Sequence, residues 1–170
     1  MNDRMSTPNT TTAQALPGAC YTSDPFFQAE MAQIHRRTWF LAGRADEIAP
    51  GAWRALDTVG GPALLVRDRD GILRAFANVC RHRGSILCEG SGSSRVLLCP
   101  YHAWSFAHDG TLLAAPGMEN TPDFDRAAHG LLPIRLDTWA GFVFLNYDDA
   151  APSLAAHLGD LPEVLAGHQP

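Results

Sequence analysis

The chain has 170 residues, of which 46% are apolar, so it is long enough to bury one core and too apolar to be mostly disordered. Thirteen basic residues against eighteen acidic ones give a net charge of −5, and neither sign forms a long run. This pattern excludes the electrostatic footprint of a nucleic-acid-binding or membrane-surface protein, so we expect proteins or small molecules as partners.

The chain begins with a segment rich in Thr, Asn and Ala that has neither the apolar core of a signal peptide nor an Arg-rich amphipathic pattern. We expect a flexible tail over residues 1–19. Asp24 then offers an N-cap, Pro25 suits the first helical position, and apolar residues recur at helical spacing from Phe27. A short helix is therefore predicted over residues 25–37.

Beyond this helix the sequence consists of short runs of branched and aromatic residues separated by Gly, Pro and Asp, a pattern typical of antiparallel sheets. Asp70-Gly71 and Asp109-Gly110 tolerate the positive φ angles of tight turns, so each is predicted to be a hairpin tip. No apolar stretch approaches the roughly 20 residues of a membrane-spanning helix. The predicted strands cover residues 39–43, 63–67, 72–78, 95–99, 104–107 and 142–146.

The last part of the sequence differs in character from the strand-rich part. From Asp148 onward, prolines interrupt a weak amphipathic pattern of leucines, which is more typical of a connector than of a core. We therefore divide the chain into the tail at 1–19, one domain at 20–150, and a connector at 151–170.

The strongest chemical signal is a pair of short motifs separated by sixteen residues, Cys80-Arg81-His82 and Cys99-Pro100-Tyr101-His102. The segment between them is rich in Gly and Ser, which predicts that both motifs lie on loops. Each loop would then present one thiolate and one imidazole, and both groups are metal ligands. Two such pairs predict a metal centre. A Cys₂His₂ zinc site, which would make the chain an interaction module without redox chemistry, is an alternative at this point.

The two motifs, read as Cys-Arg-His-Arg-Gly-Ser and Cys-Pro-Tyr-His-Ala-Trp, resemble the cluster-binding segments of Rieske non-haem iron oxygenases. The resemblance is to the α subunits of aromatic-ring-hydroxylating dioxygenases and quaternary-ammonium monooxygenases, and it covers about residues 20–165. It implies an all-β fold, a Rieske-type iron–sulfur domain of stacked antiparallel sheets with a short N-terminal helix. It also implies a Rieske [2Fe–2S] cluster, with the cysteines on one iron and the histidines on the other, held by Cys80, His82, Cys99 and His102. Trp104 and Pro116 match positions that pack around the cluster.

The same resemblance implies a function in electron transfer. The chain would accept electrons from a reductase or ferredoxin and pass them to a mononuclear Fe(II) in a catalytic domain that this sequence does not contain, within a full-length protein that commonly forms a homotrimer. We therefore assign no catalytic residue, and we do not expect this polypeptide alone to complete the oxygenase reaction. Ala103 stands before Trp104 where Gly is commoner, which resembles oxygenases acting on choline, carnitine or glycine betaine.

A free-standing Rieske ferredoxin is the alternative function, although the N-terminal helix and the tryptophan-containing C-terminal segment argue against so compact a carrier. Because two of the four cysteines sit at ligand spacing, a reduced, cytoplasmic setting fits better than a disulfide framework. Cys88 is interpreted as a buried structural residue, and Cys20 receives no role. Arg81, Arg83 and Arg95 are a hypothetical basic collar for an acidic electron donor. No role is assigned to the remaining histidines, His35, His108, His129, His157 and His168.

Overall fold

The computed structural model describes residues 15–167, so most of the predicted tail and the last three residues of the predicted connector lie outside the described residues. The helical segments are α1 (Ala19–Thr22), α2 (Asp24–Glu30), η2 (Met31–His35), η3 (Ala45–Glu47), η4 (Ala127–His129), α3 (Leu154–Leu158) and α4 (Leu161–Val164). The strands are β1 (Phe40–Arg44), β2 (Ala52–Thr58), β3 (Gly61–Arg67), β4 (Leu73–Ala77), β5 (Ser91–Ser93), β6 (Leu97–Leu98), β7 (Ser105–Phe106), β8 (Leu112–Ala114), β9 (Pro133–Trp139) and β10 (Phe142–Asn146).

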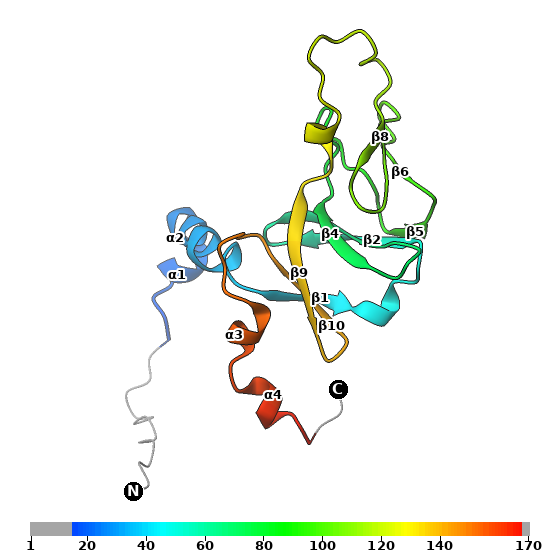
Figure 1. Ribbon diagram of the computed structural model, residues 1–170. Helices are drawn as coiled ribbons and strands as arrows, with labels where there is room; N and C mark the ends of the chain where they lie inside the picture. The colour runs from blue at the N-terminus through cyan, green and yellow to red at the C-terminus, as the bar shows by residue number, and fades with distance from the viewer. Residues whose placement is uncertain (1–14, 168–170) are drawn as a thin grey trace, which may run out of the picture.

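The strands form two antiparallel sheets. The larger sheet has the order β1-β10-β9-β4-β3-β2-β5, and the smaller one has the order β6-β7-β8. In Figure 1 the small sheet lies at one end of the large one, whereas α3 and α4 lie toward the opposite end. The prediction of an all-β fold of stacked antiparallel sheets is confirmed.

Strand β3 explains how one domain carries two apolar clusters. Its successive side chains point to opposite faces of the sheet, and both faces are buried, so the strand reads as a continuous apolar run. Ala63 and Leu65 belong to a cluster formed with β4, β9 and β10. Leu64 and Val66 belong to a second cluster that includes residues of the small sheet and of the loops around it. This second cluster fastens the small sheet to the large one.

The predicted elements agree with the structure in most places. Both predicted hairpin tips join paired strands, β3 to β4 and β7 to β8, and Gly71 and Gly110 have φ angles of 86° and 89°. The strand predicted over 95–99 is shortened to β6. Three strands were not predicted at all, β2, β5 and β9, and β8 was predicted only as the unbounded second strand of the hairpin at Asp109-Gly110. The predicted helix begins one residue earlier, with α2, and its second half is a π-helical turn, η2, so it ends at His35.

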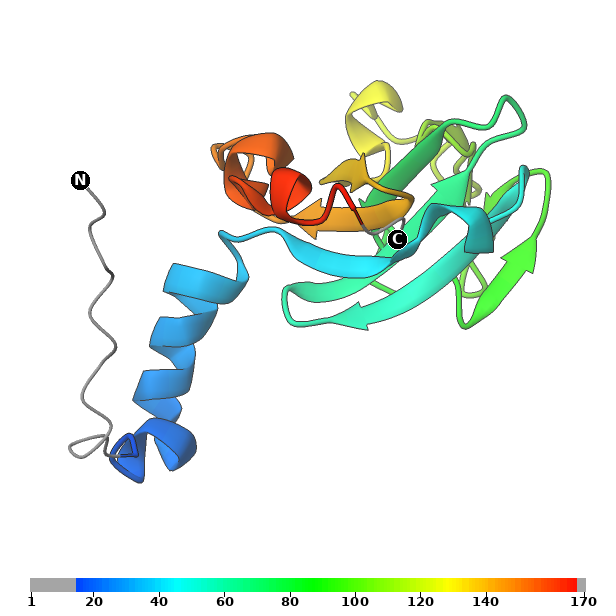
Figure 2. The ribbon, with the colours of Figure 1, turned by 90° about the horizontal axis from the view of Figure 1, so that it is seen from below.

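The N-terminal helical segment lies apart from the sheets. Figure 2 shows α1, α2 and η2, in blue, extending away from the body of the domain. Several of its large apolar side chains are exposed, among them Phe26, Phe27 and Ile34. No helix within residues 15–167 is long and apolar enough to cross a membrane.

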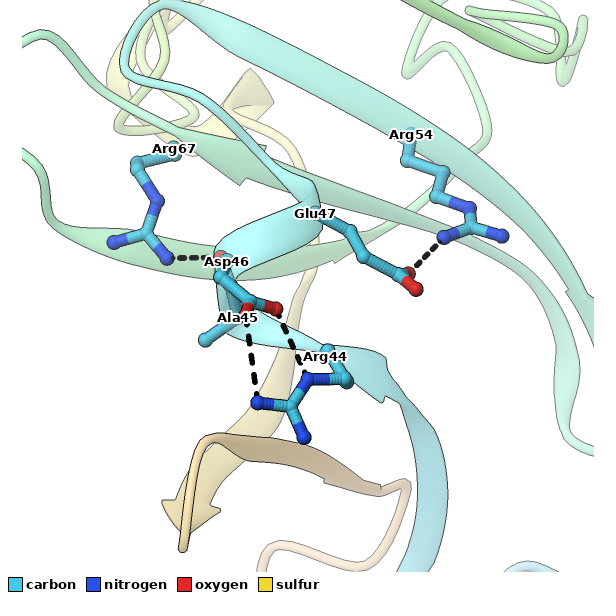
Figure 3. A network of polar contacts seen from close by, with 6 residues as sticks. All are labelled: Arg44, Ala45, Asp46, Glu47, Arg54 and Arg67. Carbon is cyan, nitrogen blue, oxygen red and sulfur yellow. Dashed lines mark hydrogen bonds and ion pairs between the residues drawn. The ribbon is translucent and has the colours of Figure 1, made fainter. Parts of the chain in front are cut away.

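Arginine side chains stabilise the connection between β1 and β2, in which η3 turns the chain (Figure 3). The Arg67 side chain donates to the carbonyl oxygen of the first residue of η3 at 2.5 Å and to that of Ile48 at 2.7 Å. Arg44 pairs with Asp46 at 3.1 Å between Nε and Oδ1, and this contact holds the pKa of the Asp46 carboxyl below its usual value. Glu47 pairs with an arginine of β2. These contacts fix one end of the large sheet.

The segment after β10 is docked onto the domain. The indole N–H of Trp39 donates to the carbonyl oxygen of Pro152 at 2.9 Å, and the Arg135 guanidinium lies 5.1 Å from the Trp39 ring centre. Arg135 also donates to carbonyl oxygens of this segment, including that of Ala151 at 2.5 Å. Leu154 is only 2% exposed. Residues 151–158 therefore form a packed contact with the domain, where the sequence pattern indicated only a connector; the domain boundaries themselves stay a prediction.

Candidate metal centre

Both Cys/His motifs lie on tight loops of the same construction. In the first loop, the backbone N–H of Cys80 donates to the carbonyl oxygen of Ser85 at 2.8 Å, and the N–H of Gly84 donates back to that of Cys80 at 3.0 Å. In the second loop, the N–H of Cys99 donates to the carbonyl oxygen of Trp104 at 2.8 Å, and that of Ala103 donates back to Cys99 at 3.1 Å. The fourth residue after each cysteine thus closes the loop.

That closing residue needs a left-handed backbone conformation in both loops. Gly84 has a φ of 73° and Ala103 has a φ of 58°. A residue with a side chain is strained there, by roughly 1–2 kcal/mol, whereas Gly is not. The alanine that the sequence singled out before Trp104 is therefore a strained position within the site.

Strands on both sides hold the loops in place. The first loop follows β4 and is closed by a bridge between Val79 and Ile86. The second loop joins β6 to β7, whose pairing places Leu98 opposite Ser105. The side chain of Asn78, which is 3% exposed, adds a further tie, because it accepts from the Cys88 N–H at 3.0 Å and donates to the Cys88 carbonyl oxygen at 2.8 Å.

The structure places the four predicted ligand residues close together, with the two cysteines more deeply buried than the two histidines. Cys80 and Cys99 are 2% and 3% exposed and belong to the core cluster beneath the small sheet. His82 and His102 are half-buried, and their ring centres are 4.8 Å apart with the rings inclined by 70°. The sulfur atoms thus lie on the inner side of the site and the imidazoles on the outer side.

Burial at the site favours the uncharged thiol of Cys80 and the neutral imidazole of His82. Burial raises the pKa of the Cys80 thiol, backbone N–H groups of His82 and Arg83 oppose that rise, and the neighbouring Cys99 thiol adds to it. Burial lowers the pKa of His82, with smaller contributions from His102 and Arg83. Backbone N–H groups of the first loop thus face the Cys80 sulfur. Neutral imidazole is the form that binds metals.

The donor atoms fit a two-iron cluster better than a single ion. The Nδ1 atom of His102 is buried and has no hydrogen-bond partner among the described residues, as expected of a nitrogen reserved for a metal. Within residues 15–167, no three or more His, Cys, Asp or Glu side chains converge in a way that would hold one metal ion. A zinc site needs four ligands around one point, whereas a [2Fe–2S] cluster needs two protein ligands for each iron.

Aromatic rings enclose the two histidines. The ring of Tyr101, which is 60% exposed, lies 3.7 Å from that of His102 between centres. Trp104 is 1% exposed and stacks on His82, and Phe124 and His129 lie edge-on against Trp104. No sequence pattern indicated a role for Phe124 and His129, since they come from the long segment after β8.

The other residues singled out in the sequence lie partly on the first loop and partly elsewhere in the domain. Cys88 is buried, and burial raises the pKa of its thiol to about 11; it and Cys20 are free thiols. Arg81 and Arg83 are exposed on the first loop and have no ion-pair partner among the residues that the structure describes. Arg95 lines a shallow hollow with Arg69. The basic collar of Arg81, Arg83 and Arg95 stays a hypothesis. His168 lies outside the described residues.

Comparison with protein-family models matches residues 38–125 to the Rieske [2Fe-2S] domain. The carnitine monooxygenase oxygenase subunit of Escherichia coli (strain K12) is 39% identical over 151 residues, which cover 88% of this chain and 40% of that protein. The glycine betaine monooxygenase oxygenase subunit of Chromohalobacter salexigens is 38% identical over 157 residues, which cover 91% of this chain and 35% of that protein.

Solved structures give the same picture. The apo form of a quaternary ammonium Rieske monooxygenase superposes with a TM-score of 0.87 at 34% identity, covering 94% of this chain and 47% of that one. Naphthalene 1,2-dioxygenase with bound indole superposes with a TM-score of 0.74 at 32% identity, covering 82% of this chain and 32% of that one. The chain thus spans less than half the length of these relatives.

Proposed function

Because the chain belongs to the Rieske [2Fe-2S] domain family, we propose that its two loops hold a [2Fe–2S] cluster through Cys80, His82, Cys99 and His102. The observation that carries this assignment is the pair of equivalent loops, which bring two buried thiols and two half-buried imidazoles to one place. The cysteines would hold the inner iron and the histidines the outer one. The partnerless Nδ1 of His102 supports its role as a ligand.

When bound, such a group supplies one-electron transfer at potentials of roughly −150 to +300 mV. The residues of this chain determine how that chemistry reaches a partner. Cys80 and Cys99, packed in the core, exclude water from the sulfur side. His82 and His102 are half-buried at the outer side, so the shortest path between the site and a partner protein runs past the imidazoles.

The proposed role is electron transfer within the oxygenase subunit of a Rieske-type mono- or dioxygenase. Electrons would come from a reductase or ferredoxin and would leave toward a mononuclear iron in the part of the full-length protein that this chain does not contain. This proposal is supported by the relatives, which are oxygenase subunits more than twice as long as the matched region. Inter-subunit electron transfer is described for the quaternary ammonium Rieske monooxygenase; we propose the same path, in a homotrimer, for the full-length form of this protein.

The names of the relatives suggest a substrate class. Two of them are named for carnitine and glycine betaine, both quaternary ammonium compounds, and Ala103 in place of the commoner Gly resembles the same group of oxygenases. We therefore propose a quaternary ammonium compound as substrate of the full-length enzyme.

All four cysteines are free, which supports a reducing, cytoplasmic setting.

The test is an anaerobic purification followed by iron, zinc and acid-labile sulfide analysis and by EPR after reduction with dithionite. We expect about two irons and two sulfides per chain and the low average g value of a histidine-ligated cluster. Cys99→Ala should lose the iron, whereas the matched variant Cys88→Ala, which removes another buried thiol from the same core, should keep it. A colourless chain containing zinc would contradict the proposal and leave an interaction module as the better interpretation.

A further inference from the structure

One aromatic residue connects the two loops of the metal centre. Trp104 follows the second loop and is 1% exposed, and its ring lies parallel to the imidazole of His82, which belongs to the first loop. The ring centres are 4.7 Å apart and the planes differ by 7°. This is the spacing and orientation of a stacked aromatic pair, so one whole face of the His82 ring is covered.

Trp104 is itself held from the opposite side. The ring of Phe124 packs edge-on at 5.7 Å between centres, and that of His129 does so at 6.1 Å. The backbone carbonyl of Trp104 accepts the N–H of Cys99, which fixes the residue to the second loop. The indole therefore cannot move away from His82 without disturbing both the segment behind it and the loop that it closes.

The orientation of the His82 imidazole depends on what its ring contacts. The χ2 torsion of histidine is intrinsically broad, so packing against the ring selects its angle. Two rings lie against His82: that of His102, inclined by 70°, and the indole of Trp104, which is parallel to within 7°. Of the two, only the indole lies flat against the imidazole and so restricts rotation about χ2.

We propose that Trp104 is a positioning residue, whose ring stacks on His82 and sets the orientation of this imidazole toward the outer iron. The inference rests on the proposed function, because it concerns one ligand of the proposed cluster. The consequence is specific to one ligand. The orientation of the His82 ring, and therefore of its ligand nitrogen, depends on Trp104, whereas the orientation of the His102 ring does not. The covered face also keeps water from His82, which disfavours the extra negative charge of the reduced state.

The experiment measures the two ligand nitrogens separately. Reduced, ¹⁵N-histidine-labelled chain is examined by ENDOR, which resolves a hyperfine coupling for each nitrogen bound to iron, and the midpoint potential is measured by EPR-monitored titration. The variants are Trp104→Leu, which removes the flat ring, and Trp104→Phe, which keeps a smaller one. Phe106→Leu is the matched control, because Phe106 is equally buried in the same core cluster.

In Trp104→Leu we expect one coupling to change, the other to stay, and the midpoint potential to rise as water reaches His82. In Trp104→Phe the same coupling should change by less, and in Phe106→Leu neither should change. If Trp104→Leu fails to assemble the cluster, the nitrogen couplings of Trp104→Phe are compared with those of Phe106→Leu, and the same expectations apply. Unchanged couplings in both Trp104 variants, a joint change of both nitrogens, or an equal effect of Phe106→Leu would overturn the inference. A wild-type chain without two nitrogen couplings would instead refute the proposed function.

Discussion

Replacing Asn78 by leucine should destabilise the domain and loosen the metal centre together. The Asn78 side chain makes two buried hydrogen bonds with the backbone of Cys88, at 2.8 and 3.0 Å, and so ties the first loop to the chain that leaves it. Leucine has a similar volume but leaves the Cys88 N–H and carbonyl oxygen without partners. Each buried group left unsatisfied costs about 1–3 kcal/mol, so the free energy of unfolding should fall by about 2–6 kcal/mol.

For a chain of this size, such a loss corresponds to a fall in Tm of about 6–18 °C. Thermal unfolding followed by circular dichroism measures it, and iron and sulfide analysis after gel filtration shows whether the cluster is retained. Asn146→Leu is the control, because Asn146 is equally buried and its side chain also makes two hydrogen bonds, with the backbone of Arg37 and Asp148. It should lower Tm similarly and leave the iron content unchanged. An Asn78→Leu chain with the wild-type Tm and iron content, or an equal loss of iron in Asn146→Leu, would refute this reasoning.

Three further predictions concern the loops and the core. Ala103→Gly should stabilise the chain by about 0.5–1 kcal/mol, because it relieves a φ of 58°, and Gly84→Ala should destabilise it, since φ is 73° there; urea denaturation measures both. Burial raises the pKa of the Cys88 thiol to about 11 in the folded chain, so this thiol ionises at lower pH in the unfolded chain. The free energy of unfolding should therefore fall as pH rises from about 9 toward 11. An equally steep fall in a Cys88→Ala chain would contradict this. Arg83→Gln should slow reduction by an acidic plant-type ferredoxin at low salt but not reduction by dithionite, whereas equal rates for variant and wild type across a salt series would exclude an electrostatic contribution.

Sequence reasoning succeeded where a short pattern requires one local structure. The two Asp-Gly pairs form the predicted hairpin tips, and the continuous apolar run of β3 is a strand buried on both faces. The resemblance to Rieske oxygenase α subunits is confirmed by the comparisons, and a free-standing ferredoxin is not favoured. The ligand assignment itself stays a proposal that the purification experiment tests.

Sequence reasoning failed where distant residues decide the structure. Strand β5 consists of Ser-Gly-Ser, which has poor strand propensity, and it pairs with β2 because Gly92 lets the backbone approach the Trp53 ring. A Cβ at Gly92 would lie 2.7 Å from that ring. Strand β9 begins with Pro133 and then carries apolar residues interspersed with charged ones. Because proline is disfavoured within strands, its presence argued against predicting a strand here.

The same limitation explains what was missed around the metal centre. Asn78 acts through the backbone of Cys88, ten residues away, and Phe124 reaches Trp104 from a long irregular segment. Neither contact has a sequence period or a spacing rule. Such supporting residues become visible only when the packing of the loops is known.

The contact of Trp39 with Pro152 has a mechanical consequence. The chain enters the sheets just after Trp39 and leaves them just before Pro152, and the indole N–H joins these two points at 2.9 Å while Arg135 bonds both sides. Tension applied along the segments before Trp39 and after Pro152 should therefore act on this contact before it acts on the sheets. Such an arrangement would reduce the pull that the adjoining chain exerts on the loops at the far end of the domain.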